Sequence, residues 1–390
     1  MKKRLLINWA FYRPVGHLLE ALQHARGYYA ANRDVVEISL LVNAASPSTL
    51  VKACPWITGV YPIDFAEVQS QHERAASLQA VPPTWDYIVT DPRIAIQDPT
   101  IGGRGAEAMI ATQAVVRQYL RAADWSGSSR GWECKWNTTG LLGREDPLPY
   151  AANARFSLPI PADARVFAGH YHHHHGPMIC VLPGGGSSGL QQNPSLEVWS
   201  DILMALADEF SNLRVYITGL SRDMAGQIHT KGLSSQDSDV LARRLPFVTN
   251  CFDIGLWNQV ALIAECDILL APHTGFAFIG QFVGTPWLAI SRCPWPEYLF
   301  NGIPFYSVIP DCDSYPAQWR MDCECNQRIA HCEKTVCMED DRVRARIPDL
   351  INGARFLLEP NVTYEQAIRV HVENLRRQKR NLDQFAFFMD

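Results

Sequence analysis

The sequence has no apolar run of the about 18 residues that a membrane-spanning helix needs, and it has no excess of positive charge. Its 35 Lys and Arg residues face 40 Asp and Glu residues, so the formal net charge is −5 at pH 7. The first absence predicts that no segment spans a membrane, and contact with a membrane surface stays open. The second argues against nucleic acid as a partner. A fixed-period repeat is also missing.

The chain is long enough, and apolar enough, to form more than one globular domain. Its 390 residues are 47% hydrophobic and 19% charged, which is typical of a globular protein with two or more domains. The 11 cysteines are an odd number in a chain large enough to bury a core, which favours the reducing cytoplasm over a disulfide scaffold. The basic first residues precede an apolar stretch that Asn8, Arg13 and His17 interrupt, so a strand is expected there rather than a signal peptide.

Apolar strand-like runs alternate with segments of helical periodicity in both halves of the chain, which predicts the α/β class with two doubly wound parallel sheets. The alternation breaks at residues 99–150, a turn-rich insertion, and at a polar, His-rich stretch that ends at Gly176. The expected domains are residues 1–176 and residues 177–363. Residues 364–390 are expected to form a helical segment that packs back on the N-terminal domain.

The first candidate site is the stretch Pro14-Val15-Gly16-His17, where a glycine turn follows a strand and His17 opens a helix. A neutral imidazole at the carboxyl end of a strand suits a general base, and a histidine that only caps a helix is the alternative. Asp91, after the strand that ends near Val89, could orient the imidazole, and Asp86 and Asp98 compete with it. An Asp before a proline also makes turns.

Two loops in the second half suit phosphate groups, because each follows a strand and exposes backbone N–H groups. The first has neither the Gly-Lys-Ser/Thr of a Walker loop nor the spacing of the dinucleotide fingerprint, so a plain tight turn is its alternative reading. Two such loops in one domain suggest a diphosphate. Their residues, with the turn glycine of a neighbouring strand, are Gly185, Gly186, Ser187, Ser188, Gly219, His273, Thr274 and Gly275.

A cysteine cluster near the C-terminus could form a tetrahedral zinc site. Its members are Cys323, Cys325, Cys332 and Cys337. The Cys-x-Cys spacing is tighter than that of most zinc sites, and Cys312 and His331 are spare ligands. The histidine run at 172–175 is read as a solvated linker, with metal binding as the alternative.

The C-terminal half resembles glycosyltransferase family 9, the lipopolysaccharide heptosyltransferases that use ADP-heptose and adopt the GT-B fold. The resemblance covers about residues 178–345 and lies in four stretches: 181–186, 215–219, 266–275 with 284–286, and the cysteine-rich 323–338. The sequence departs from that family with His273-Thr274-Gly275 in place of Asp-Thr-Gly, and with Phe278 in place of His. Its Pro-x-Gly-His17 is similar instead to UDP-glycosyltransferases, whose His is the base paired to an Asp.

These resemblances imply a GT-B fold, two Rossmann-like domains facing a cleft. They imply an inverting glycosyltransferase that moves a heptose or hexose from a nucleotide-sugar to a saccharide or glycoside acceptor, in glycan, lipopolysaccharide or natural-product biosynthesis. His17 and Asp91 would be catalytic, the two loops would bind the donor, and Arg13, Trp125 and Trp132 would bind the acceptor. No cofactor or catalytic metal is expected. A GT-B sugar-nucleotide epimerase or hydrolase, or a non-enzymatic zinc-stabilised binding protein, is the alternative.

Overall fold

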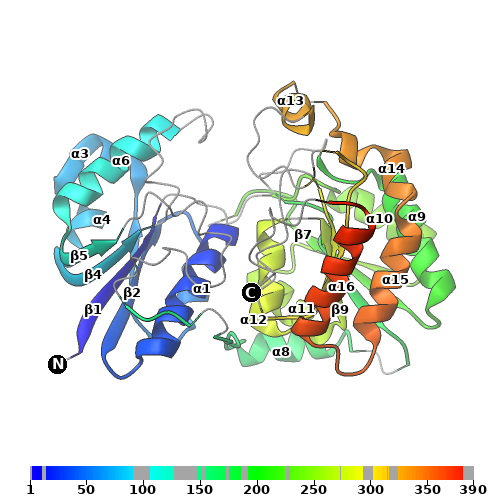
Figure 1. Cartoon of the computed structure of the whole chain (residues 1–390), viewed down its shortest axis with the longest axis horizontal. Coiled ribbons are helices and arrows are strands. Elements are labelled where there is room, and N and C mark those ends of the chain that lie inside the picture. The colour runs from blue at the N-terminus through cyan, green and yellow to red at the C-terminus, as the bar shows by residue number, and fades with distance from the viewer. Residues whose placement is uncertain are drawn as a thin grey trace. The chain divides into compact units, whose positions relative to one another are not determined.

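The computed structural model divides the chain into two compact units, one ending at Leu158 and one beginning at Pro159 (Figure 1). The residues described are 2–10, 15–90, 106–126, 148–151, 154–172, 175–185, 192–224, 229–272, 274–292, 302–313, 315, 324–331 and 333–380. Each unit is built on a parallel sheet, so the predicted α/β class is confirmed. No helix among these residues has the length and apolar character needed to cross a membrane.

The first unit has a sheet of order β3-β2-β1-β4-β5, with every neighbouring pair parallel. The strands are β1 Lys3–Trp9, β2 Val36–Asn43, β3 Ile57–Ile63, β4 Thr84–Thr90 and β5 Arg121–Ser126. The helical elements are α1 Val15–Asn32, α2 Thr49–Lys52, α3 Phe65–Gln71, η1 His72–Arg74, α4 Ala76–Gln79 and α6 Ala106–Tyr119. The strands are rich in Val, Ile and Leu, as parallel strands buried on both faces require.

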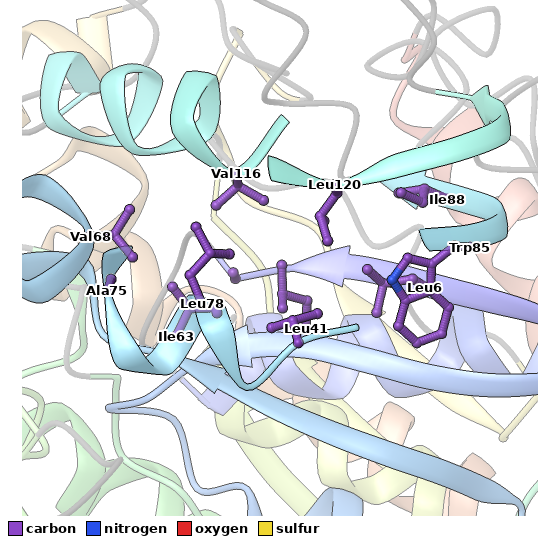
Figure 2. Close-up of a cluster of buried hydrophobic side chains, with 12 residues drawn as sticks. Leu6, Leu41, Ile63, Val68, Ala75, Leu78, Trp85, Ile88, Val116 and Leu120 are labelled. Atoms are coloured by element: carbon purple, nitrogen blue, oxygen red, sulfur yellow. The ribbon is translucent and has the colours of Figure 1, made fainter. Parts of the chain in front are cut away.

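The core of the first unit lies between the sheet and the helices α3, α4 and α6 (Figure 2). Leu6, Leu41 and Ile88 project from the strands, and Leu78 and Val116 meet them from the helices. Each fully buried side chain of this size contributes about 1.5–3 kcal/mol. Because side chains alternate along a strand, the neighbours of Leu6 in β1 point to the opposite face, which packs on α1.

The second unit has a sheet of order β11-β10-β9-β6-β7-β8, also parallel throughout. Its strands are β6 Met178–Val181, β7 Arg214–Gly219, β8 Val248–Phe252, β9 Ile268–Pro272, β10 Trp287–Ile290 and β11 Phe305–Val308. Its helical elements are α8 Ala162–Gly169, α9 Leu196–Glu209, α10 Ser235–Arg244, α11 Leu256–Glu265, η5 Gly275–Ile279, α12 Gly280–Val283, α13 Glu324–Ala330, η6 Val336–Met338, α14 Asp340–Arg344, α15 Ile347–Leu358 and α16 Tyr364–Arg377.

Two segments group differently from the domain limits predicted at residues 176 and 364. Helix α8 belongs to the second unit, because Ala164 and Ala168 pack against Ala261 of α11. Helix α16 also packs within the second unit. The ring of Phe305 in β11 lies 5.5 Å from that of His371, and burial lowers the pKa of His371 to about 3. The packing of the C-terminal segment on the N-terminal domain stays a prediction, and residues 381–390 lie outside the described residues.

Candidate active site

The sheet of the first unit changes direction between β1 and β4. The chain runs outward from β1 to β2 and β3, and then returns to β4 on the other side of β1. Asn8, near the end of β1, pairs with Thr90, the last residue of β4, so both strands end at the same edge. In doubly wound sheets ligands bind at this edge, outside the carboxyl ends of the strands where the order reverses. His17 lies in the first turn of α1, the helix that follows β1.

His17 contacts a carboxylate from its own helix. Its Nδ1 lies 3.1 Å from Oε2 of Glu20, one helical turn further along α1. The His17 side chain is 22% exposed, whereas that of Glu20 is only 6% exposed. If Nδ1 carries the proton of a neutral imidazole and donates it to Glu20, the lone pair is on Nε2, as in a general base with an orienting carboxylate.

The pairing with Glu20 was not expected from the sequence, although the spacing of three residues on one helix was a usable signal. The contact depends on the side chains turning toward each other, which spacing alone does not determine. A second contact positions the same helix, because the ring of His24 lies 4.6 Å from that of Trp9, the last residue of β1. This packing joins the third turn of α1 to the end of the strand that precedes the helix.

Most of the other site residues predicted in the first unit lie outside the described residues. Asp91, Arg13 and Trp132 lie outside the described residues. Trp125 belongs to β5, where its backbone is in register with Ile88 of β4, and its side chain is outside the description. These roles stay predictions.

In the second unit the sheet changes direction between β6 and β9. Strands β7 and β8 lie on one side of β6, and β9, β10 and β11 lie on the other. The loops after β6 and β9 therefore start next to each other at the carboxyl edge, where the N–H of Leu182 donates to the carbonyl oxygen of Leu270. These are the two loops that the sequence predicted as phosphate sites. The fold places both at the position where doubly wound domains bind ligands.

The loop after β6 is glycine-rich for a packing reason as well. A Cβ on Gly184 would lie 2.8 Å from the backbone of Gly232, and one on Gly232 would lie 2.0 Å from the carbonyl oxygen of Pro183. The two backbones thus cross in contact, with no room for a side chain at either position. Gly185 is buried beside them, and Gly186, Ser187 and Ser188 lie outside the described residues.

Thr274 precedes η5 in the loop after β9, and it is only 4% exposed. Its hydroxyl makes no hydrogen bond to the helix that it precedes. Gly275 begins that helix and is half-buried, and His273 lies outside the described residues.

Gly219, predicted beside the donor, has a clear packing role. A Cβ there would lie 2.6 Å from Oγ1 of Thr230 and 2.7 Å from the ring of Phe252. Its carbonyl oxygen accepts hydrogen bonds from the Gln259 side chain, at 3.2 Å, and from the backbone N–H of Asp253, at 3.0 Å. These contacts explain why position 219 is a glycine, with no need for a bound ligand there.

A buried arginine that was not expected from the sequence lies in the same unit. Arg292 follows β10, is 2% exposed, and donates from Nη1 to Oε1 of Gln192 at 2.8 Å. Burial lowers the pKa of Arg292 to about 10, so the guanidinium still carries its charge at neutral pH. Gln192 follows the glycine-rich loop, and the contact therefore puts a positive charge near that loop. Because 100 residues separate the partners, no local pattern signals the pair.

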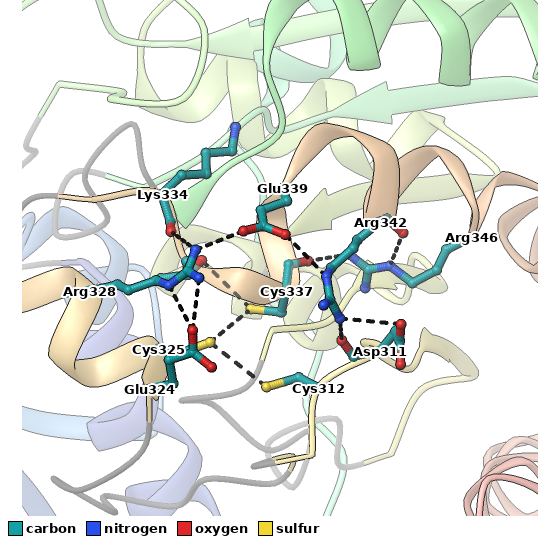
Figure 3. A network of polar contacts seen from close by, with 11 residues as sticks. Asp311, Cys312, Glu324, Cys325, Arg328, Lys334, Cys337, Glu339, Arg342 and Arg346 are labelled. Atoms are coloured by element: carbon teal, nitrogen blue, oxygen red, sulfur yellow. Dashed lines mark hydrogen bonds and ion pairs between the residues drawn. The ribbon is translucent and has the colours of Figure 1, made fainter.

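The cysteine-rich segment brings three buried thiols together (Figure 3). The Sγ of Cys325 lies 3.8 Å from that of Cys337 and 3.8 Å from that of Cys312. Across the described residues, no group of three or more His, Cys, Asp or Glu side chains is arranged to hold a metal ion. Cys323 and Cys332 lie outside these residues. The zinc site stays a prediction, which metal analysis of the purified protein would test.

Ion pairs surround these thiols (Figure 3). Arg328 of α13 contacts Glu339 at 2.7 Å, and Glu339 contacts Arg342 of α14 at 3.1 Å. Arg342 in turn reaches Asp311, after β11, at 3.3 Å. The network joins segments that are close in space but separate in sequence.

No protein-family model and no curated protein matches the chain. Solved structures do resemble it. The E. coli ADP-heptose lipopolysaccharide heptosyltransferase II has a TM-score of 0.53 at 13% identity, covering 91% of this chain and 100% of that one. A family 9 glycosyltransferase from Veillonella parvula has a TM-score of 0.54 at 11% identity, covering 90% and 97%. E. coli heptosyltransferase WaaC with ADP has a TM-score of 0.53 at 12% identity, covering 89% and 99%. At these identities the likeness establishes a shared fold, the GT-B fold expected from the sequence.

Proposed function

We propose that the protein is an inverting glycosyltransferase that uses a nucleotide-sugar donor. The observation that carries the proposal is the His17–Glu20 pair, a base with an orienting carboxylate, at the edge of the first sheet where the strand order reverses. The likeness to heptosyltransferases over nine-tenths of the chain supports it. The glycine-rich and Thr274 loops at the matching edge of the second sheet give the donor diphosphate a place to bind.

The proposed reaction begins at His17. The imidazole takes the proton of an acceptor hydroxyl as the hydroxyl oxygen attacks the anomeric carbon of the donor sugar. A new carbon–oxygen bond forms, the bond from the anomeric carbon to the diphosphate oxygen breaks, and the nucleoside diphosphate leaves with that electron pair. Glu20 holds the ring and stabilises the imidazolium that forms, and Asp91 is a further proposed carboxylate partner.

The leaving diphosphate would be stabilised by the second unit. The backbone N–H of Gly185 and the hydroxyl of Thr274 would donate hydrogen bonds to its oxygens, together with Gly186, Ser187, Ser188, His273 and Gly275. Arg292 would add a positive charge behind the glycine-rich loop, through its contact with Gln192.

The proposed acceptor is a saccharide or glycoside, with Arg13, Trp125 and Trp132 as its contacts. ADP-heptose is the first donor to test, since ADP-heptose is named for heptosyltransferase II and ADP for heptosyltransferase WaaC. The proposed location is the cytoplasm, because an odd number of cysteines in a chain of this size favours a reducing compartment over a disulfide scaffold.

A donor screen tests the proposed function. The full chain is incubated with ADP-, UDP-, GDP- and TDP-sugars, with and without saccharide acceptors, and release of nucleoside diphosphate is measured. A transferase is expected to release it from one donor class at a rate that rises at least tenfold with a suitable acceptor. Equal release without acceptor would indicate an epimerase or hydrolase, and no binding of any nucleotide-sugar would contradict an enzyme of this class.

A further inference from the structure

Arg26 is a buried cation in the middle of α1 that the proposed reaction does not use. It is 8% exposed, and its Nε has no hydrogen-bond partner. Within the described part of the chain, no hydrogen bond or ion pair joins its guanidinium to another residue. Burial lowers the pKa of Arg26 to about 10, so it remains charged at neutral pH. A buried charge without a counter-ion costs several kcal/mol in general, and folds rarely keep one that nothing compensates.

The segment that crosses α1 beside Arg26 is held firmly in place. The N–H of Ala151 donates to the carbonyl oxygen of Gly27 at 3.1 Å, and the side chain of Asn32 donates to the carbonyl oxygen of Pro149 at 2.7 Å. A Cβ on Gly27 would lie 2.2 Å from the ring of Tyr150, so the glycine lets the aromatic ring rest on the helix backbone. These contacts place Tyr150 over the stretch of α1 that includes Arg26.

A second cation, Arg155, acts on Arg26 through its charge. Arg155 is exposed, and its charge further lowers the pKa of Arg26, whereas Tyr150 acts in the opposite direction. Tyr150 also places its hydroxyl 3.5 Å from Nδ1 of His24. Arg155 directly follows Ala154, whose N–H donates to the carbonyl oxygen of Ala151 at 3.1 Å, so it continues the segment that is bonded to α1. No described carboxylate pairs with Arg26 there.

We propose that Arg26 and Arg155, with Tyr150, form a binding site for an oxyanion, either a phosphate or a carboxylate group. The planar guanidinium donates two parallel hydrogen bonds, which match the oxygens of both groups. An anion bound there supplies the counter-charge that Arg26 lacks, and it offsets the repulsion between the two arginines. The exposed Arg155 is the arginine that an anion from solvent meets first. The buried Arg26 binds the anion more strongly than Arg155 does, because less water competes for its guanidinium.

This site is separate from the proposed catalytic edge. Arg26 follows His17 by nine residues, which is about 13 Å along a helix, and about half a turn around its axis. An anion at Arg26 therefore does not meet the lone pair of His17. The proposal is independent of the proposed glycosyl transfer, because its test measures binding and unfolding without turnover.

Thermal unfolding of the full chain tests the anion site. Sodium phosphate and sodium citrate are compared with sodium chloride at matched ionic strength, in the wild type and in Arg26→Gln, Arg155→Gln and Arg33→Gln. The wild type is expected to gain about 4 °C in Tm with one or both oxyanions over chloride, because a ligand that binds only the folded state stabilises it. Arg26→Gln and Arg155→Gln are expected to lose that gain. Arg33→Gln, an exposed change just after α1, should keep it.

Calorimetric titration with the more stabilising anion gives a second readout. The dissociation constant is expected to rise at least tenfold in Arg26→Gln, and by a smaller factor in Arg155→Gln. In chloride alone, Arg26→Gln should melt at or above the wild-type temperature, since it removes an uncompensated buried charge. No oxyanion effect in the wild type, or an equal effect in all four proteins, would overturn the proposal. Arg155 is exposed, so the test does not depend on whether Arg26→Gln folds.

Discussion

His17→Ala is expected to lower turnover by about 10²–10⁴-fold, the usual contribution of a positioned general base. The donor affinity should stay nearly unchanged, because the imidazole acts on the acceptor hydroxyl in the transition state. The pH–rate profile should also lose its acidic limb. Turnover, donor binding and Tm are measured on the same preparations. A variant that turns over at the wild-type rate per folded molecule, with a lowered Tm, would show that His17 only caps its helix.

Glu20→Gln is the companion variant, because Gln keeps the size of the side chain and removes the charge. If Glu20 positions His17, turnover falls by less than in His17→Ala, and the acidic limb of the pH–rate profile moves. A purely structural role for this buried carboxylate would lower Tm and leave the profile in place. Gln23→Ala, on the same helix, is the matched control and should change neither quantity.

Thr274→Val is expected to weaken nucleotide-sugar binding by about tenfold to a hundredfold, the loss of one hydrogen bond to a charged group. Val has nearly the shape of Thr without the hydroxyl, and the native hydroxyl makes no hydrogen bond to η5, so the fold should persist. Calorimetric titration with the donor found in the screen measures the effect.

The control for this change is Thr218→Val, at the end of β7. That threonine is also buried, but its hydroxyl donates to the carbonyl oxygen of Cys251 at 2.9 Å. Its loss should lower Tm with little effect on the donor. If Thr274→Val binds the donor as tightly as the wild type, the diphosphate does not contact this loop.

The architecture could be predicted because strands and crossover helices leave local periodic signals. The runs Leu5–Trp9, 178–182 and 267–271 lie within a residue or two of β1, β6 and β9. The short strand β8, Val248–Phe252, and the long-range contact of Arg292 with Gln192 have no comparable signal. The helical segment from Tyr364 was expected for its apolar positions. Periodicity shows that a helix face is buried, but not which surface buries it, so the contact of α16 with β11 could not be predicted.

In the candidate site too, residues with a local sequence signal could be predicted, and residues whose role depends on packing could not. His17 and the loop glycines could be proposed because each stands at the end of an apolar strand, where parallel topology collects functional groups. Glu20 was missed because a carboxylate inside a helix looks like any solvated surface residue until the helix is placed. Glu20 is buried, and only the packing of α1 on the sheet determines that.

The crossing of the Gly184 and Gly232 backbones limits how this protein can be redesigned. Neither position accepts a side chain, and each blocks the other, so a single substitution at one cannot be rescued by a change at its partner. A library aimed at donor preference should therefore keep both glycines and randomise only positions beyond Gly185 and around Thr274. Keeping both glycines holds the loop backbone in its native position. A change in donor selectivity can then be attributed to the varied side chains rather than to a displaced loop.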